Sequence, residues 1–200
     1  MNRTDIFFQT KFLKSAFSIQ DLPDDIGSEV SFCGRSNSGK SSVLNALTGN
    51  KKLAKISKTP GRTQSMNIFS LDPSSEKRIV DLPGYGFARV SKAMRREWGQ
   101  VIGQYLKTRK SLKGIVVIMD IRHPFKDSDL NLIKWSNENN IPLKILFNKA
   151  DKLPKYKTIE EVVKGNNVLR KLKVFGEIQV LSSKNLTGLD EFKKSLSSWF

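Results

Sequence analysis

The chain has 200 residues, of which 35 are Lys or Arg and 19 are Asp or Glu, and its formal net charge is +16. This length suffices for one domain with a substantial core and leaves little room for a second domain. Such an excess of positive charge predicts a polyanionic partner, either nucleic acid or an acidic membrane surface. The single cysteine, Cys33, excludes an internal disulfide framework. No signal peptide is visible and the longest apolar run, 115–119, is too short to cross a bilayer, so we expect a soluble cytoplasmic protein without a membrane partner.

The elements expected in the first half surround a glycine-bounded loop. Residues 1–28 carry scattered aromatic side chains and a turn-like segment, which predicts a short extension with an edge strand packed on the core. A buried strand, a helix, a two-stranded hairpin and a second helix are then expected at 29–33, 40–49, 66–71 with 77–81, and around 98–105. Residues 50–65 are polar and basic with little periodicity, which predicts a loop.

Strands and helices alternate in the second half. We expect strands at 115–119, 143–147 and 178–181, and helices at 127–140, at 158–173 and from Leu189 to the C-terminus. The second of these helices should turn Ile159, Val162 and Leu169 inward. This pattern predicts a single three-layer α/β domain over 1–200, whose six-stranded sheet is mostly parallel with one antiparallel strand. Ligands of such sheets bind beyond the carboxyl ends of the strands.

The run Gly34-Arg35-Ser36-Asn37-Ser38-Gly39-Lys40-Ser41 has the spacing of a phosphate-binding loop between a strand and a helix. Its glycines let several backbone N–H groups point at a phosphate, and the start of the following helix adds its positive dipole end. Lys40 would reach the β- and γ-phosphates, and the Ser41 hydroxyl would bind Mg²⁺. A chance match of the four fixed positions is expected in under about 1% of chains of this length, so we interpret the run as a nucleotide site.

Two further motifs follow predicted strands. Asp81-Leu82-Pro83-Gly84 could hold Mg²⁺ through water and offer the Gly84 N–H to a γ-phosphate. Asn148-Lys149-Ala150-Asp151 is more specific, because the Asp151 carboxylate can accept from two N–H donors of guanine that adenine does not present together. Lys149 would lie along the base and Asn148 would brace the loop. A site that pairs those donors rejects the wrong base strongly, so the order of motifs predicts GTP.

Two shorter stretches complete the pattern. Ser182-Ser183-Lys184 follows the last strand and could offer a backbone N–H to guanine O6. Between the phosphate loop and Asp81, a residue should be ordered by Mg²⁺ and the γ-phosphate, and Thr59 and Thr63 both suit that role. The spacing does not choose between them.

Four strings together resemble the EngB family of bacterial ribosome-assembly GTPases: Arg35-Ser36-Asn37, Thr59-Pro60-Gly61-Arg62-Thr63-Gln64, Asp81-Leu82-Pro83-Gly84-Tyr85-Gly86-Phe87-Ala88 and Asp120-Ile121-Arg122-His123-Pro124. The resemblance runs from about residue 12 to the C-terminus. It implies a Ras-like G domain of the P-loop class that is needed for maturation of the large ribosomal subunit and, through it, for growth and cell division. It also indicates Thr63, rather than Thr59, as the Mg²⁺ ligand.

The motifs and the resemblance together define the expected site. Mg²⁺ would be held by Ser41, Thr63 and, through water, Asp81, while Lys40, Thr63 and Asn37 are candidates for stabilising phosphate charge. The expected GTP and GDP contacts are Gly34, Arg35, Ser36, Asn37, Ser38, Gly39, Lys40, Ser41, Ser42, Pro60, Gly61, Arg62, Thr63, Asp81, Leu82, Pro83, Gly84, Asn148, Lys149, Ala150, Asp151, Leu181, Ser182, Ser183 and Lys184.

Two basic segments flank the expected switches. Residues 51–62 contain no acid, and residues 89–113 contain Glu97 alone. A charge run is usually a solvated face, but such faces normally mix signs, which favours binding of a polyanion. The RNA-contact candidates in the second segment are Arg89, Lys92, Arg95, Arg96, Lys107, Arg109 and Lys110. The single histidine, His123, is expected to be structural, and the tryptophans are expected to pack in the core.

Three hypotheses remain at this point. The first is a monomeric GTPase switch whose nucleotide sets its affinity for the large ribosomal subunit or its precursor, with hydrolysis slow because Tyr85 replaces a water-orienting Gln. Asn37 could hold K⁺ near the phosphates or could simply form the turn. The second is a structural RNA-binding assembly factor in which hydrolysis is incidental. The third, an ATP-using P-loop enzyme, is disfavoured by Asn148 and Asp151.

Overall fold

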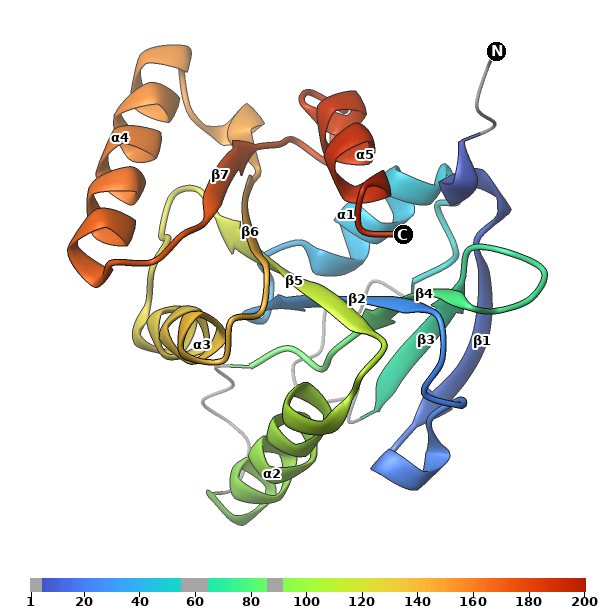
Figure 1. The fold of residues 1–200 in the computed structure, drawn as a ribbon. Helices are drawn as coiled ribbons and strands as arrows, with labels where there is room; N and C mark the ends of the chain where they lie inside the picture. Colours follow the sequence, from blue (N-terminus) through green and yellow to red (C-terminus); the bar gives the residue numbers. More distant parts are fainter. Residues whose placement is uncertain (1–4, 55–64, 86–91) are drawn as a thin grey trace.

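The computed structural model describes residues 5–54, 65–85 and 92–200. The described chain forms three layers, with a central sheet covered by helices on both faces (Figure 1). The strands are β1 Lys11–Ala16, β2 Ser28–Gly34, β3 Met66–Ser70, β4 Lys77–Asp81, β5 Leu112–Asp120, β6 Leu143–Asn148 and β7 Glu177–Val180. The helices are α1 Lys40–Thr48, α2 Lys92–Thr108, α3 Asp127–Glu138, α4 Lys155–Leu172 and α5 Leu189–Ser197, with short 3₁₀ turns η1 Ile6–Gln9, η2 Ile19–Asp21 and η3 Ala150–Lys152.

The sheet confirms the predicted α/β class and extends it by one strand. Its order in the described chain is β1-β3-β4-β2-β5-β6-β7, which makes seven strands rather than six. The additional strand is β1, the edge strand of the N-terminal extension, which pairs with β3. β3 is antiparallel to both of its neighbours, β1 and β4, whereas the pairs from β4 through β7 are parallel. The carboxyl ends of the parallel strands therefore meet at one edge of the sheet.

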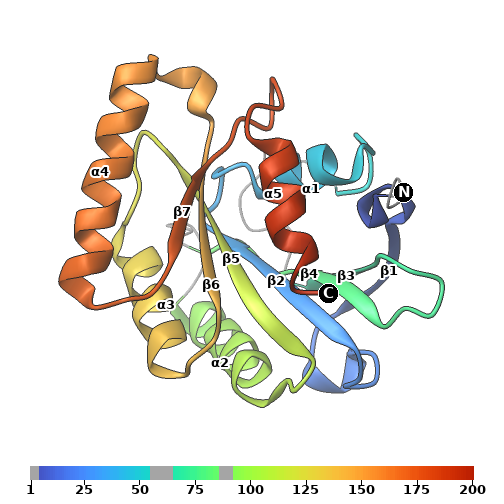
Figure 2. The same ribbon diagram turned by 45° about the horizontal axis from the view of Figure 1, so that its top comes forward.

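Two apolar cores lie on the two faces of the sheet, and β5 contributes to both. Ile115, Val117 and Met119 pack under α2, α3 and α4, while Val116 and Ile118 face α1 and α5. This division follows from the alternation of side chains along a strand, and it explains why β5 is apolar at every position from Ile115 to Met119. The rotated view in Figure 2 shows α5 and α1 in front of the sheet, with α2 and α3 behind.

The helix α4 corrects one expectation about facing. Val162 and Leu169 pack toward the core as predicted, but the side chain of Ile159 is 56% exposed. Gly165 marks the line of closest approach to the sheet, because a Cβ added there would lie 2.7 Å from Ile178 Cδ1. Ile159 precedes Gly165 by six residues, which places it about 120° around the helix from that line. Periodicity identified the helix correctly and misplaced the centre of its buried face.

The tryptophans follow the expectation of core packing where they are described. Trp135 packs against the core beneath α3, and Trp199 packs against the core beneath α5. Trp199 also covers Gly114, where an added Cβ would lie 2.7 Å from the indole ring. The side chain of Trp98 lies outside the described part of the structure.

A buried charge cluster at the amino end of β2 corrects the prediction that Arg109 contacts RNA. The carboxylate of Glu29 is fully buried and accepts from Arg78 Nε at 2.7 Å and from Arg109 Nη2 at 2.8 Å. The hydroxyl of Tyr105 donates to the same carboxylate at 3.2 Å. Only 8% of the Arg109 side chain is exposed. Its guanidinium donates to Glu29 and to the backbone carbonyls of Pro23 and Asp24 in the loop before β2. A buried carboxylate is tolerated because charged partners surround it.

Among residues 5–54, 65–85 and 92–200, no helix is both long and apolar enough to cross a membrane.

Candidate nucleotide-binding site

The predicted motifs lie together at the carboxyl edge of the sheet. The phosphate loop joins β2 to α1, Asp81 ends β4, and Asn148 ends β6. The helix α1 begins at Lys40 after Gly39, whose φ of +96° is a left-handed conformation that favours glycine. A side chain at Gly39 would also clash with Asn148, because its Cβ would lie 2.3 Å from the Asn148 amide nitrogen. The loop therefore needs a glycine for both its turn and its contact with the Asn148 loop.

Asn148 connects three of the predicted loops. Its amide nitrogen donates to the carbonyl of Ser38 at 3.0 Å, and its amide oxygen accepts from the backbone N–H of Ser183 at 3.1 Å. The side chain is fully buried, so both hydrogen bonds are shielded from water. The phosphate loop and the serine turn after β7 are thereby fixed relative to the strand that carries Asn148.

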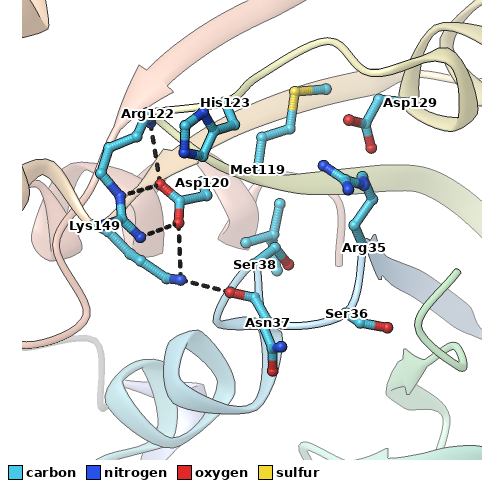
Figure 3. Close-up of a pocket in the computed structure, with 11 residues that line it drawn as sticks. Arg35, Ser36, Asn37, Ser38, Met119, Asp120, Arg122, His123, Asp129 and Lys149 are labelled. Atoms are coloured by element: carbon cyan, nitrogen blue, oxygen red, sulfur yellow. Dashed lines mark hydrogen bonds and ion pairs between the residues drawn. The ribbon is translucent and has the colours of Figure 1, made fainter. Parts of the chain in front are cut away.

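Lys149 is held by both backbone and charge. It adopts a left-handed φ of +66°, and its ammonium donates to the carbonyl of Asn37 and, at 2.9 Å, to Asp120 Oδ2. Arg122 donates to the same carboxylate, with Nη2 2.7 Å from Oδ2 (Figure 3). Burial of Asp120 would raise its pKa, but the hydrogen bonds from Arg122 and Lys149 outweigh that effect and hold the pKa below its ordinary value.

Asp120 is a site residue that the motif analysis did not assign. Its register opposite Asn148 on the neighbouring strand places it beside Lys149. The signal in the sequence was the position of an acid at the end of a buried strand, next to the motif strand. That signal identifies an edge of the sheet, but it does not identify the lysine that the carboxylate contacts.

Asp151 is positioned by the serine turn. The hydroxyl of Ser182 donates to Asp151 Oδ1 at 2.7 Å, and this hydrogen bond holds the pKa of the Asp151 carboxyl below its usual value. Ser182 is fully buried, and the Ala150 N–H bonds to the Leu181 carbonyl at 3.2 Å, which joins the two loops. The ionised carboxylate can accept two N–H donors, which is the pattern that guanine presents. Lys184, the last predicted contact, is exposed at the end of this turn.

The lysine predicted to bind phosphate contacts the predicted metal ligand. Lys40 Nζ forms an ion pair with Asp81 Oδ1, and the side chains are 12% and 7% exposed. Ser41, in the first turn of α1, supplies a hydroxyl near the same edge, and Ser42 follows it with a half-buried side chain. Hydroxyl and carboxylate oxygens are the ligands that Mg²⁺ prefers, so Ser41 and Asp81 fit the ion. No group of three or more His, Cys, Asp or Glu side chains that could hold a metal occurs within the described ranges.

Tyr85 ties the second motif to the phosphate loop and to α3. Its carbonyl accepts from the Ser36 N–H at 3.1 Å, and its hydroxyl donates to Asp129 Oδ1 at 2.9 Å. Gly84 lies against the same loop, since a Cβ there would be 3.5 Å from Ser36 N. Burial and the neighbouring Asp129 charge raise the pKa of the Tyr85 phenol well above its usual value, so the hydroxyl remains a donor. Leu82 and Pro83 connect this segment to β4, and Leu82 is buried.

Several predicted residues lie outside the described part of the chain. They are the switch candidates Thr59, Pro60, Gly61, Arg62 and Thr63, together with Arg89. Lys92, Arg95 and Arg96 belong to the first turns of α2, but their side chains are not described. Lys107 is exposed in the last turn of α2, about 16 to 23 Å along the helix from Arg96, Arg95 and Lys92, and Lys110 is exposed just after the helix. The candidates of the basic segment 89–113 that belong to α2 are therefore spread along the length of the helix.

Comparisons with known proteins place these features in a family. The profile of a family described as 50S ribosome-binding GTPase matches residues 29–149. A protein from Alteromonas mediterranea named "Probable GTP-binding protein EngB" is 50% identical over 194 residues, which cover 97% of this chain and 91% of the relative. A protein of the same name from Coxiella burnetii is 47% identical over 198 residues, which cover 96% of this chain and 93% of the relative. The chain belongs to the EngB family of GTP-binding proteins.

Solved structures agree with the fold. A crystal structure of a probable GTP-binding protein EngB superimposes with a TM-score of 0.68 at 22% identity, over 86% of this chain and 97% of that chain. Era, in complex with MgGDPNP and a segment of 16S ribosomal RNA, gives a TM-score of 0.67 at 23% identity over 87% of this chain and 57% of that chain. At these identities the two structures show a shared fold. With the family, they establish the GTP-binding P-loop domain that the motifs predicted.

We predict that guanine selectivity depends on Asp151. Changing Asp151 to Asn replaces an acceptor with a donor that matches the carbonyl of xanthine, so the affinity for GDP should fall by about 10²-fold or more and the affinity for xanthosine diphosphate should rise. Calorimetric titration with both nucleotides measures the two changes. The variant Asp190→Asn removes an exposed carboxylate from the first turn of α5 and should bind GDP normally. Unchanged GDP affinity in Asp151→Asn would refute the assignment.

Proposed function

We propose that this EngB-family protein is a GTP-dependent switch that acts in the assembly of the large ribosomal subunit. The observation that carries the proposal is the hydrogen-bonded assembly of the phosphate loop, Lys149, Asp151 and the serine turn at one edge of the sheet. That assembly supports a guanine nucleotide site, and the net charge of +16 supports a polyanionic partner. The family profile, described as 50S ribosome-binding GTPase, supports the large subunit as that partner.

The residues of the site suggest how GTP would be held. The backbone N–H groups of the phosphate loop and the start of α1 would bind the phosphates, and Lys40 would exchange its ion pair with Asp81 for contact with them. Ser41, and Asp81 through water, would hold Mg²⁺, with Thr63 as the third ligand that the family resemblance implies. Bound Mg²⁺ supplies positive charge that stabilises the charge on the β- and γ-phosphates.

Tyr85 provides the connection between nucleotide and partner. A γ-phosphate that draws in the Gly84 N–H competes with the hydrogen bond between Ser36 and the Tyr85 carbonyl. Tyr85 begins the segment that leads into α2, and its hydroxyl is anchored on α3, so a change there reaches two helices. A ligand shifts such an equilibrium only by its differential affinity for the two states, and the γ-phosphate is the group that distinguishes GTP from GDP. Because Tyr85 cannot orient water as Gln does, hydrolysis is slow without a partner.

Asn37 is the candidate for K⁺-dependent turnover. It lies exposed in the phosphate loop with a φ of +63°, a conformation that Asn and Gly tolerate. We predict faster GTP hydrolysis in K⁺ than in Na⁺, and loss of this difference in Asn37→Gly, which keeps the turn accessible and removes the amide. The measurement is phosphate release in the two salts at equal ionic strength, with and without ribosomal subunits. Asn167→Ala, at an exposed position of α4, is the matched control. Equal rates in both salts would mean that Asn37 forms the turn and does not bind K⁺.

The proposed RNA-binding surface adjoins the switch end of α2. We predict that large subunits bind the protein more tightly with GTP than with GDP, and that affinity falls steeply with salt because bound phosphates release counterions. The double change Arg95→Glu with Arg96→Glu should weaken binding and reduce the log–log salt slope by about 0.7 for each RNA phosphate that the variant no longer neutralises. Lys107→Glu with Lys110→Glu makes the same charge change near the other end of the helix and should preserve the difference between GTP and GDP.

The test is co-sedimentation of each variant with purified large subunits across a salt series in both nucleotides. Equal binding in GTP and GDP would reject the switch in favour of a structural assembly factor. Binding without salt dependence would reject the charge argument.

A further inference from the structure

A cavity lies beside the phosphate loop, between that loop, the end of β5 and the start of α3. We call it the α3-side cavity. It is bounded by the loop residues Arg35–Ser38, the end of β5, the turn after β5 and the start of α3, and its volume is about 230 Å³ (Figure 3). Its lining residues are Arg35, Ser36, Asn37, Ser38, Ile118, Met119, Asp120, Arg122, His123, Asp129 and Lys149.

The lining overlaps the expected nucleotide contacts only in part: it shares Arg35–Ser38 and Lys149 with them, and its other six residues come from β5, the turn after β5 and α3. Gly39, Lys40 and Ser41, which would surround the nucleotide phosphates, do not line it, and neither do Asp81 and Asp151. Ligand sites for drug-sized molecules usually exceed about 300 Å³, whereas one water molecule occupies about 30 Å³. A cavity of about 230 Å³ therefore suits a small ligand of a few heavy atoms rather than a second nucleotide.

The carboxylates of the cavity already have their partners. Asp120 accepts from the backbone N–H, Nε and Nη2 of Arg122 and from Lys149 Nζ. Asp129 accepts from the Tyr85 hydroxyl at 2.9 Å and from the Lys126 N–H at 3.0 Å. Burial raises the pKa of Asp129, and the charge of nearby Arg35 opposes part of that rise. Little acceptor capacity remains for a ligand that brings donors.

Donors and positive charge remain in excess. Three cationic side chains line the cavity against two carboxylates, and His123 at its exposed rim adds a further charge when protonated. The Ser38 hydroxyl is buried, with the residue 3% exposed, and finds no hydrogen-bond partner among the described residues. A buried hydroxyl without a partner costs free energy comparable to a lost hydrogen bond, so a ligand that accepts from it would be favoured.

We propose that the α3-side cavity binds a small oxyanion of the size of a phosphoryl group, through Arg35, Ser38, Arg122 and His123. The ligand chemistry follows from the excess of donors and the net positive charge, and guanidinium groups are the donors best matched to phosphoryl oxygens. The phosphoryl group can belong to a free phosphate ester or to the backbone of an RNA strand, and these two sources differ in charge and in substitution.

The single histidine of the chain makes the test direct. Nuclear magnetic resonance signals of the His123 ring are followed in protein saturated with Mg²⁺ and a non-hydrolysable GTP analogue, so that the phosphate-loop site is filled. Nucleotide occupancy is measured separately, so a failure of the nucleotide assignment is seen in its own right. Sodium phosphate should shift the ring signals saturably, because a bound anion changes the electrostatic surroundings of the imidazole. Sodium chloride at equal ionic strength should not shift them saturably.

Three variants identify the cavity. Arg35→Gln should weaken phosphate binding by about tenfold or more, and Ser38→Ala by about fivefold, because each removes a donor to the anion. Ser38→Ala removes no hydrogen bond of the described structure, so it also serves if Arg35→Gln folds poorly. Arg170→Gln removes the same charge from an exposed site near the end of α4 and should have no effect. The proposal would be overturned if phosphate caused no saturable shift or if chloride caused the same shift. It would also be overturned if Arg35→Gln and Ser38→Ala bound phosphate as tightly as the unchanged protein.

The source of the phosphoryl group is found with two further probes. Dimethyl phosphate is a phosphodiester, and its binding would support the backbone of an RNA strand as the ligand. Binding of methyl phosphate without dimethyl phosphate would support the same site as one for a free phosphate ester.

Discussion

The functional edge of this protein depends on the side-chain amide of Asn148. Its two hydrogen bonds, to the Ser38 carbonyl and to the Ser183 N–H, join the phosphate loop, the guanine-recognition loop and the serine turn at a fully buried point. Because Gly39 packs directly against this amide, the same side chain also dictates that the loop contains a glycine. Loops without regular structure are usually mobile, and a buried amide that satisfies both of its polar ends restricts these three to one arrangement.

The opposite end of the sheet is fixed in a different way. There the buried Glu29 carboxylate joins β2 to β4 through Arg78 and to the chain after α2 through Arg109. This anchors the end of α2 that is farther from the nucleotide edge, while the other end follows the Tyr85 segment. A helix fixed at one end and joined at the other to the segment after Tyr85 is the element that the proposed switch would move. The Tyr85 hydroxyl joins the start of that segment to Asp129 at the start of α3.

The sequence predicted the parts of this account that depend on local pattern. Strands with apolar runs, helices with a 3.6-residue period and motifs of fixed spacing at strand ends led to the fold, the phosphate loop and the guanine motif. The features that it missed are interactions between distant residues. Arg109 meets Glu29 across 80 positions, and Tyr85 meets Asp129 across 44. No local pattern shows that one arginine of a basic run is buried while its neighbours are exposed.

The misplaced face of α4 has a similar cause. A helical period shows that one face is apolar, but which residue lies nearest the sheet depends on how the helix is docked. Here that residue is Gly165, whose missing side chain makes room for Ile178, Phe125 and Phe147, and a glycine contributes nothing to an apolar pattern. Likewise Asp120 was visible as an acid at a strand end, but only the register of β5 against β6 brings it to Lys149.

The central claim is that Asn148 fixes the three loops of the site and does not determine the selectivity for guanine. The nucleotide affinities of Asn148→Ala test this claim. Removal of its two buried hydrogen bonds leaves the Ser38 carbonyl and the Ser183 N–H without their partner, which should weaken GDP and GTP alike by about 10- to 10²-fold. The preference for GDP over xanthosine diphosphate should stay as it is in the unchanged protein, since Asp151 remains in place. Calorimetric titration of the variant with GDP, a GTP analogue and xanthosine diphosphate gives all three values. Unchanged affinities, or a weakening confined to the guanine nucleotides, would contradict this account.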